Sequence, residues 1–208
     1  MNTLCKLCEK KRARRYCPGV NGDICPVCCG MERENTIDCP SDCEYLREAR
    51  AHEKPIPVTE AEFPHKDVEV SEEFLREHEP VVMWIATSLA RAMEKARAVD
   101  RDAQEALESL IQTYLTLKSG LIYETRPPNP YAAGIQDDLK RAIDEFGKRL
   151  AEEAGMHTLR DTDILGTLVF LERLALHHRN GRPRGRSFYD FLREYFPVEA
   201  AAEPAVEL

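Results

Sequence analysis

The chain has 208 residues, of which 43% are hydrophobic and 32% are charged, and its 29 basic and 37 acidic side chains give a formal net charge of −8 at pH 7. This apolar content is enough to bury a core, so we expect a folded chain. The longest purely apolar run, Val81–Ala86, is far shorter than the roughly 20 residues that cross a bilayer. The basic amino terminus lacks the apolar stretch of a secretory signal. These features exclude membrane-spanning, collagen-like and secreted proteins, and they predict a soluble cytoplasmic one.

Eight cysteines are crowded into the amino-terminal segment that ends at Cys43, and residues 44–208 contain none. This density is typical of disulfide scaffolds and of metal-binding modules. A reducing cytoplasm favours free thiols over disulfides, and so short a segment needs a cross-link in order to fold. The sequence therefore predicts a cysteine-rich zinc module over residues 1–53.

The spacing of the cysteines predicts two zinc ions, each held by four thiolates in a closed tetrahedron. Two pairs have the C-x2-C spacing of zinc knuckles, and we assign them to one ion as a first cysteine set: Cys5, Cys8, Cys25 and Cys28. The other four form a second cysteine set for the other ion: Cys17, Cys29, Cys39 and Cys43. In this interleaved arrangement the chain alternates between the two ions.

Several alternatives remain open at this stage. Cys28 and Cys29 are adjacent and could exchange places, and His52 could replace a thiolate. One zinc ion with a few buried free cysteines would also account for the pattern, as would an iron–sulfur cluster, which uses four thiolates too. Cys39 and Cys43 are expected at the start of a helix over residues 44–53, where thiols four residues apart share one face.

Residues 25–46 read CPVCCGMERENTIDCPSDCEYL. This string resembles the amino-terminal signature of uncharacterised bacterial proteins with a CPxCCG and then a CPxDCxYL pattern. The interleaved spacing is also similar in style to treble-clef and cross-brace zinc fingers. The resemblance covers residues 5–46; it implies zinc and implies no known activity or catalytic residue.

An acidic linker is predicted to follow the zinc module. Residues 54–70 contain three prolines and no helical or strand periodicity, which indicates an extended segment. Residues 55–80 carry eight acidic and two basic side chains. Such runs are typical of solvated faces, and some serve as docking segments for basic partners.

Residues 71–197 are predicted to form an α-helical bundle of about five helices, so the fold class is mainly α. Ser71 is expected to start the first helix, and Pro80 either ends that helix or opens the next. Asp100 is expected to cap a long helix whose apolar pattern continues to Ile122, and the proline-rich residues 124–134 are expected to form a loop.

Three shorter helical patterns complete the chain. The first runs from Ile135 to Gly155, and the second begins at Asp161 or Asp163 and stops at Asn180-Gly181. The last lies between Phe188 and Pro197, and residues 198–208 are expected to form a frayed, flexible tail.

Catalysis is not expected from these motifs. The chain contains no HExxH, GxxxxGK[ST], GxGxxG or GxSxG pattern. Its one Glu-x-x-His, which ends at His65, contains Pro64 and therefore fails as a helical di-iron motif. His177 and His178 are adjacent, so on a helix they point about 100° apart and cannot share an ion.

Two basic stretches are candidate phosphate or nucleic-acid contacts. The first lies between cysteines and contains Lys10, Lys11, Arg12, Arg14 and Arg15. The second lies in a Gly/Pro-rich loop and contains Arg179, Arg182, Arg184 and Arg186. The first stretch could instead offset thiolate charge, and the second could pair with acids on neighbouring helices. The acidic balance of the chain argues against strong nonspecific binding.

The leading interpretation is a non-enzymatic, zinc-binding interaction or adaptor protein, with a zinc head that recognises a protein partner and a helical body. The alternative is a nucleic-acid-binding regulator that uses both basic stretches together. The sequence predicts no membrane contact, and it specifies neither the partner nor the oligomeric state.

Overall fold

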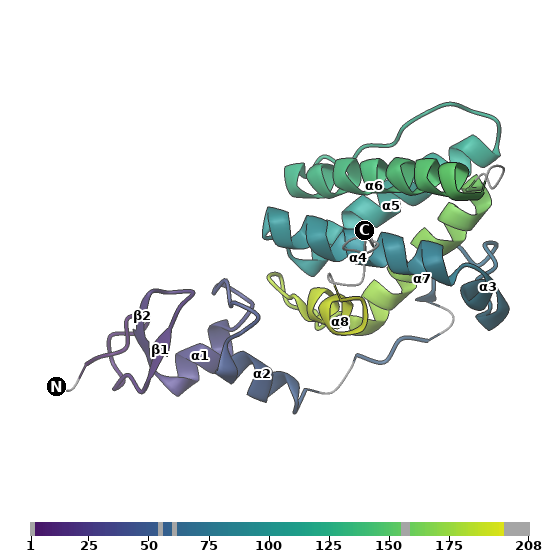
Figure 1. Cartoon of the computed structure of the whole chain (residues 1–208). Coiled ribbons are helices and arrows are strands. Elements are labelled where there is room, and N and C mark those ends of the chain that lie inside the picture. Colours follow the sequence, from purple (N-terminus) through teal and green to yellow (C-terminus); the bar gives the residue numbers. More distant parts are fainter. Residues whose placement is uncertain (1–2, 54–55, 60–61, 155–158, 198–208) are drawn as a thin grey trace, which may run out of the picture.

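The computed structural model describes residues 3–53, 56–59, 62–154 and 159–197. Within these ranges it contains eight helices and one two-stranded sheet, which confirms a mainly α fold (Figure 1). The expected helix end at Gly155 and the expected tail over 198–208 lie outside the described residues. No helix in the described ranges is both long and apolar enough to cross a membrane.

The head, residues 3–53, is built around a small hairpin. Strand β1 (Arg15–Cys17) pairs antiparallel with β2 (Gly22–Ile24), and two short helices follow, α1 (Pro26–Glu32) and α2 (Glu44–Arg50). The hairpin was not among the predicted elements, because three-residue strands are too short to show alternation. Few apolar side chains are buried here besides cysteines: Ile24, Ile37 and Leu46.

The bundle consists of six helices rather than about five: α3 (Glu72–Glu77), α4 (Glu79–Ala96), α5 (Asp100–Lys118), α6 (Pro130–Ala154), α7 (Asp161–His178) and α8 (Ser187–Tyr195). Its core is separate from that of the head, and its fully buried side chains include Leu89, Leu107, Leu110, Ile135 and Leu168. The indole of Trp84 on α4 donates to the carbonyl of Ala142 on α6 at 2.7 Å, which joins these two helices.

Several predicted helix boundaries are confirmed and others are wrong. The Ser71 hydroxyl accepts from the Phe74 amide and caps α3, and Pro80 lies in the first turn of α4. Helix α5 ends at Lys118, so Leu121 and Ile122 lie in an exposed loop instead of the helix. Helix α6 begins at Pro130, inside the predicted loop 124–134, because proline is well tolerated in a first helical turn.

Asp100 caps a different helix from the one predicted. The α5 start is closed by Asp102, whose carboxylate accepts from the Val99 amide at 2.9 Å. The carboxylate of Asp100 accepts from the amides of Phe188 and Tyr189 in the first turn of α8, at 3.0 and 3.1 Å. Burial raises the pKa of Asp100 to about 7, although these two amides favour the charged form. Asp100 therefore joins α5 to α8.

The predicted linker is packed against the bundle where the structure describes it. Val68 is buried in the bundle core. One guanidinium nitrogen of Arg173 on α7 donates to the carbonyls of His65 at 2.8 Å, Pro64 at 3.3 Å and Val68 at 3.4 Å. The segment is irregular, as expected, but its backbone is held by a charged donor that no local sequence pattern predicts.

The contacts of Arg173 predict how trypsin acts on this segment. Lys66 is an exposed cleavage site bracketed by the three carbonyls that Arg173 binds. We expect Arg173→Ala to accelerate cleavage after Lys66 by at least about tenfold, because hydrogen bonds to a charged group contribute about 1.5–3 kcal/mol. Limited trypsin digestion followed by mass spectrometry measures this rate. Arg101→Ala, which removes an exposed helical arginine, should leave it unchanged; equal rates in both variants would contradict the assignment.

Candidate metal centre

The first cysteine set is brought together in the head. The sulfur atoms of Cys5, Cys8, Cys25 and Cys28 all lie within 4.8 Å of one another. Cys5 and Cys25 are buried, whereas Cys8 and Cys28 are partly exposed. All eight cysteines are free thiols, and none forms a disulfide. Four convergent thiols of this kind can hold one metal ion.

Backbone pairing places these four thiols. The Cys5 amide donates to the Lys11 carbonyl at 2.9 Å, which closes the turn that carries Cys8. Cys25 is the N-cap residue of α1, and its thiol accepts from the Cys28 amide at 3.4 Å. Each C-x2-C pair therefore belongs to a tight turn, and the two turns face each other.

The electrostatics of the quartet favour a bound cation. Burial raises the pKa of the Cys5 thiol, but backbone amides led by that of Cys25 outweigh burial and lower it to about 6. The amides of Lys10 and Lys11 likewise lower the pKa of Cys8. The neighbouring Cys25 thiol and then burial raise the pKa of Cys28 to about 12. Backbone amides thus stabilise negative charge on Cys5 and Cys8. Because the four sulfurs are close together, ionisation of all four is unfavourable unless a cation lies between them.

The second cysteine set lines one small cavity between β1, α1 and the start of α2, but among the described residues only the first set has its sulfur atoms within 4.8 Å of one another; the second set is Cys17, Cys29, Cys39 and Cys43. The guanidinium groups of Arg15 and Arg33 approach the Cys29 sulfur at 3.6 and 3.9 Å. Burial raises the pKa of Cys39, partly opposed by a hydrogen bond from the Glu34 amide. Cys43 is the N-cap residue of α2 and Cys39 precedes the helix, so the prediction that both share a helical face is wrong. His52 is exposed at the end of the head.

The two predicted basic stretches lie in different places. The first is at the hairpin end of the head, where Lys10, Lys11, Arg12 and Arg14 are exposed and Arg15 stacks over the Tyr45 ring at 4.1 Å. The second, which we name the arginine loop (residues 179–186), joins α7 to α8 and contacts the head. The first stretch therefore lies at the hairpin, whereas the second lies against Glu34 and Asp38 of the head.

Three of the four arginines of the arginine loop are paired with acids. Arg179 lies 3.7 Å from a Glu62 oxygen, and Arg182 lies 2.6 Å from a Glu53 oxygen. Arg186 is 2.7 Å from Asp38, and it also donates to the carbonyls of Cys39, Arg97 and Ala98. Arg184 takes part through its backbone amide, which donates to the Glu34 carbonyl. The loop arginines therefore pair with acids of the head and of the segment that precedes the bundle, rather than with acids on neighbouring helices as the structural alternative expected.

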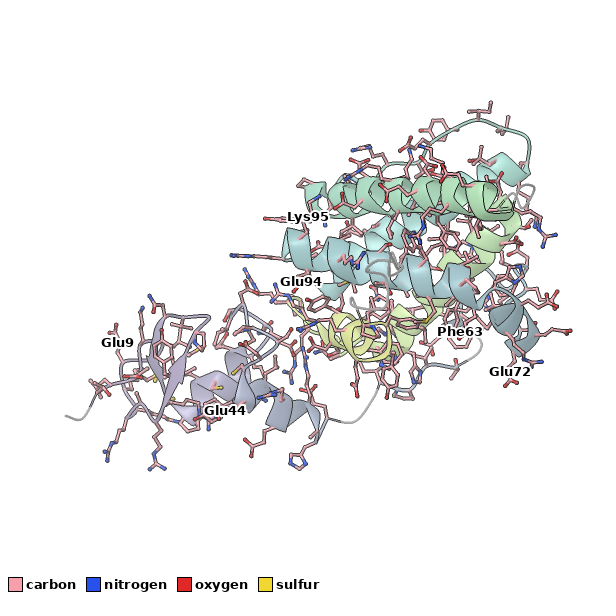
Figure 2. The ribbon with its side chains drawn as sticks, viewed as in Figure 1. Glu9, Glu44, Phe63, Glu72, Glu94 and Lys95 are labelled. Atoms are coloured by element: carbon pink, nitrogen blue, oxygen red, sulfur yellow. The ribbon has the colours of Figure 1, made fainter. Side chains whose placement is uncertain are left out.

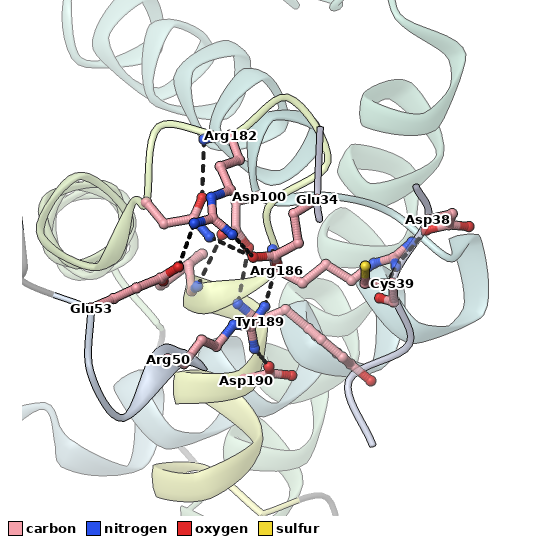
Figure 3. A network of polar contacts seen from close by, with 12 residues as sticks. Glu34, Asp38, Cys39, Arg50, Glu53, Asp100, Arg182, Arg186, Tyr189 and Asp190 are labelled. Atoms are coloured by element: carbon pink, nitrogen blue, oxygen red, sulfur yellow. Dashed lines mark hydrogen bonds and ion pairs between the residues drawn. The ribbon is translucent and has the colours of Figure 1, made fainter. Parts of the chain in front are cut away.

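Glu34 is the centre of this docking contact between the head and the arginine loop (Figure 3). Its carboxylate is buried and accepts from the Arg50 guanidinium, from the Asn180 side-chain amide at 2.9 Å and from the Arg186 backbone amide at 3.2 Å. Arg182 lies 3.6 Å from Oε2, the carboxylate oxygen that Asn180 also contacts. A buried charge with so many donors is stabilised only while all of them remain in place.

The backbone of Glu34 also takes part in the docking contact, through both its carbonyl and its amide. Its carbonyl accepts from the Arg184 amide at 2.8 Å, and its own amide donates to the Cys39 thiol. The residue has a φ of 52°, which is unusual for a side chain larger than glycine. Glu34 therefore joins the second cysteine set to the arginine loop. In the sequence it was one acid among many, and only its position in the fold identifies it.

Comparison of the chain with protein-family models, with curated protein sequences and with solved structures found no match. The function is therefore argued from the two cysteine sets, the docking contact and the exposed surfaces of the described residues.

The docking contact predicts a large effect of Glu34→Gln. The new amide would place a donor against Asn180 or Arg50, so a buried hydrogen-bonded ion pair would be broken. We expect the free energy of unfolding to fall by about 3 kcal/mol, measured by urea denaturation followed by circular dichroism.

Glu32→Gln is the matched control for this measurement. The Glu32 carboxylate lies two residues away and accepts from the Thr36 hydroxyl on the surface. Its substitution should change the free energy of unfolding by less than about 0.5 kcal/mol. Similar losses in both variants would show that the docking contact has no special role.

Proposed function

We propose that this chain is a zinc-binding, non-enzymatic interaction protein, in which a metal-stabilised head is docked on a helical body. The observation that carries the proposal is the convergence of four free thiols within 4.8 Å in the first cysteine set. The head buries few apolar side chains apart from cysteines. A metal ion would supply the cross-link that so small a core needs.

Zinc suits the first set better than an iron–sulfur cluster. Four thiolates at about 2.3 Å from one ion lie about 3.8 Å apart in a tetrahedron, which is compatible with sulfurs that are all within 4.8 Å. A cluster would place several iron and sulfide atoms between its cysteines and hold the sulfurs further apart. The resemblance of residues 25–46 to zinc-module signatures points the same way.

We assign a second zinc ion to Cys17, Cys29, Cys39 and Cys43. The support is their shared cavity and the approach of Arg15 and Arg33 to Cys29. Each zinc tetrathiolate carries a net charge of −2, so neighbouring guanidinium groups offset the excess negative charge. Free thiols in this number suit a reducing compartment, and we propose the cytoplasm.

An interaction role is supported by the apolar side chains that remain exposed. Leu7 and Val27 project from the two knuckles, and Met31 follows Val27 by one turn on α1. The loop between α5 and α6 exposes Leu121, Ile122 and Tyr123. Grouped exposed apolar side chains often mark contact surfaces for other proteins.

The proposal predicts about two zinc ions per chain in protein purified without added metal, measured by elemental analysis. Cys8→Ser should remove the ion of the first set and leave the other, while Cys43→Ser should do the reverse. Loss of either ion should unfold part of the head, because metal binding supplies much of the free energy that folds the head.

Arg47→Ser, an exposed change on α2 that removes no thiol, is the control and should keep both ions. Iron with inorganic sulfide, or a metal content near zero, would contradict the zinc proposal. Loss of both ions in each cysteine variant would contradict the assignment of two separate sets.

A further inference from the structure

The strand that enters the hairpin presents two arginines and a tyrosine on one face. Arg12, Arg14 and Tyr16 are exposed, whereas the residues between them are partly buried. This alternation follows from the two-residue repeat of extended backbone. Leu4 pairs with Arg12 in an isolated antiparallel bridge, and Tyr16 on β1 pairs with Asp23 on β2. The face therefore carries two guanidinium groups, one aromatic ring and a single acid.

The cations of this face have no acidic partner among the described residues. Lys10, Lys11, Arg12 and Arg14 form none of the ion pairs found in the described ranges, whereas three of the four arginines in the arginine loop do. Lys10 and Lys11 lie in the turn just before the strand, with their amides directed to Cys8 and their side chains exposed. In Figure 2, side chains that end in nitrogen project from the β1–β2 end of the head, away from the bundle. A chain of net charge −8 thus keeps a separate local group of four free cations.

Tyr16 adds a stacking surface beside these cations. Its side chain is 56% exposed, and its hydroxyl donates to the Asn21 side chain at 2.7 Å. This hydrogen bond fixes the ring, so its face is available without loss of much side-chain entropy. Cations that follow a backbone, together with an ordered aromatic ring, are the two elements of single-strand recognition by proteins.

We propose that this face, consisting of Lys10, Lys11, Arg12, Arg14 and Tyr16, binds single-stranded nucleic acid. The four cations contact successive phosphates, and one base stacks on the Tyr16 ring. The site is confined to the hairpin end of the head, because the arginine loop is occupied by the docking contact. It depends on the proposed zinc of the first cysteine set, since Cys5 and Cys8 close the turn that presents Lys10 and Lys11.

An acidic protein segment is the competing occupant of the same face. The cations alone would suit both, but an exposed aromatic ring next to Arg14 on the same face favours a base over an acidic side chain. The aliphatic side chains that would suit a protein, Leu7, Val27 and Met31, lie on the knuckles and α1 instead. The overall acidity of the chain limits binding to the few phosphates that this face can reach.

Fluorescence anisotropy with labelled dT20 and rU20 tests the proposal on the full zinc-loaded chain. We expect micromolar binding at low salt, with a slope of log K against log salt of about −3 for four phosphates at roughly −0.7 each. A preference between rU20 and dU20, which differ only in the sugar, would identify the natural strand as RNA or DNA. A 20-base-pair duplex should bind more weakly than both.

Three variants assign the binding to this face. Arg12→Ser/Arg14→Ser should weaken binding at least tenfold and reduce the slope by about 1.4. Tyr16→Leu should weaken it about tenfold through loss of stacking, whereas Tyr16→Phe should stay within about threefold. Arg47→Ser/Arg76→Ser changes the charge equally at exposed arginines elsewhere and should have little effect.

Zinc content is measured for every variant, which separates a failure of this proposal from a failure of the zinc proposal. The proposal is overturned if zinc-loaded wild-type protein binds neither single strand at 50 mM salt, or if the two double-arginine variants lose affinity equally. Binding of poly-L-glutamate as tight as that of dT20 and rU20 would also overturn it, and would assign the face to an acidic protein segment.

Discussion

The arrangement of the head on the bundle depends on one buried carboxylate, that of Glu34. Its exposure is 0%, yet it accepts from the Arg50 guanidinium, the Asn180 amide and the Arg186 backbone. Burying a charge is costly unless it is paired and hydrogen-bonded, so these donors must be held in place together. Arg50 comes from α2, whereas Asn180 and Arg186 come from the loop between α7 and α8. The carboxylate is therefore satisfied only when both parts of the chain are folded and in contact.

The same residue connects the docking contact to the cysteines. The Glu34 amide donates to the Cys39 thiol, and the Cys39 carbonyl accepts from Arg186 at 3.2 Å. A zinc ion in the second cysteine set would fix Cys39 and with it the segment that carries Glu34. The arginine loop then has a structural role, and the cations at the hairpin end remain free for binding. In the proposed account, the two basic stretches of this acidic chain therefore have different tasks.

Sequence reasoning found the features that depend on local pattern. The C-x2-C spacing predicted the quartet that contains Cys5 and Cys25, and helical periodicity predicted the bundle. It failed where long-range contacts decide the outcome: Asp100 caps α8 rather than α5, and Glu34 has no distinguishing pattern around it. Ile122 continues the apolar periodicity of α5 but is 97% exposed, because the helix ends at Lys118 and the chain turns at Gly120, whose φ is 79°. A contact between residues that are far apart in the sequence produces no local sequence pattern from which it could be predicted.

Hydrogen exchange of the arginine loop with and without metal tests most directly whether the metal-held head and the bundle form one docked unit. The amides of Arg184 and Arg186 donate to the carbonyl and carboxylate of Glu34. If metal holds the docking segment, its removal by a chelator should accelerate exchange of these two amides by about tenfold or more, while amides in the centre of α5 keep their protection. Unchanged exchange at Arg184 and Arg186 after complete metal removal would contradict the account.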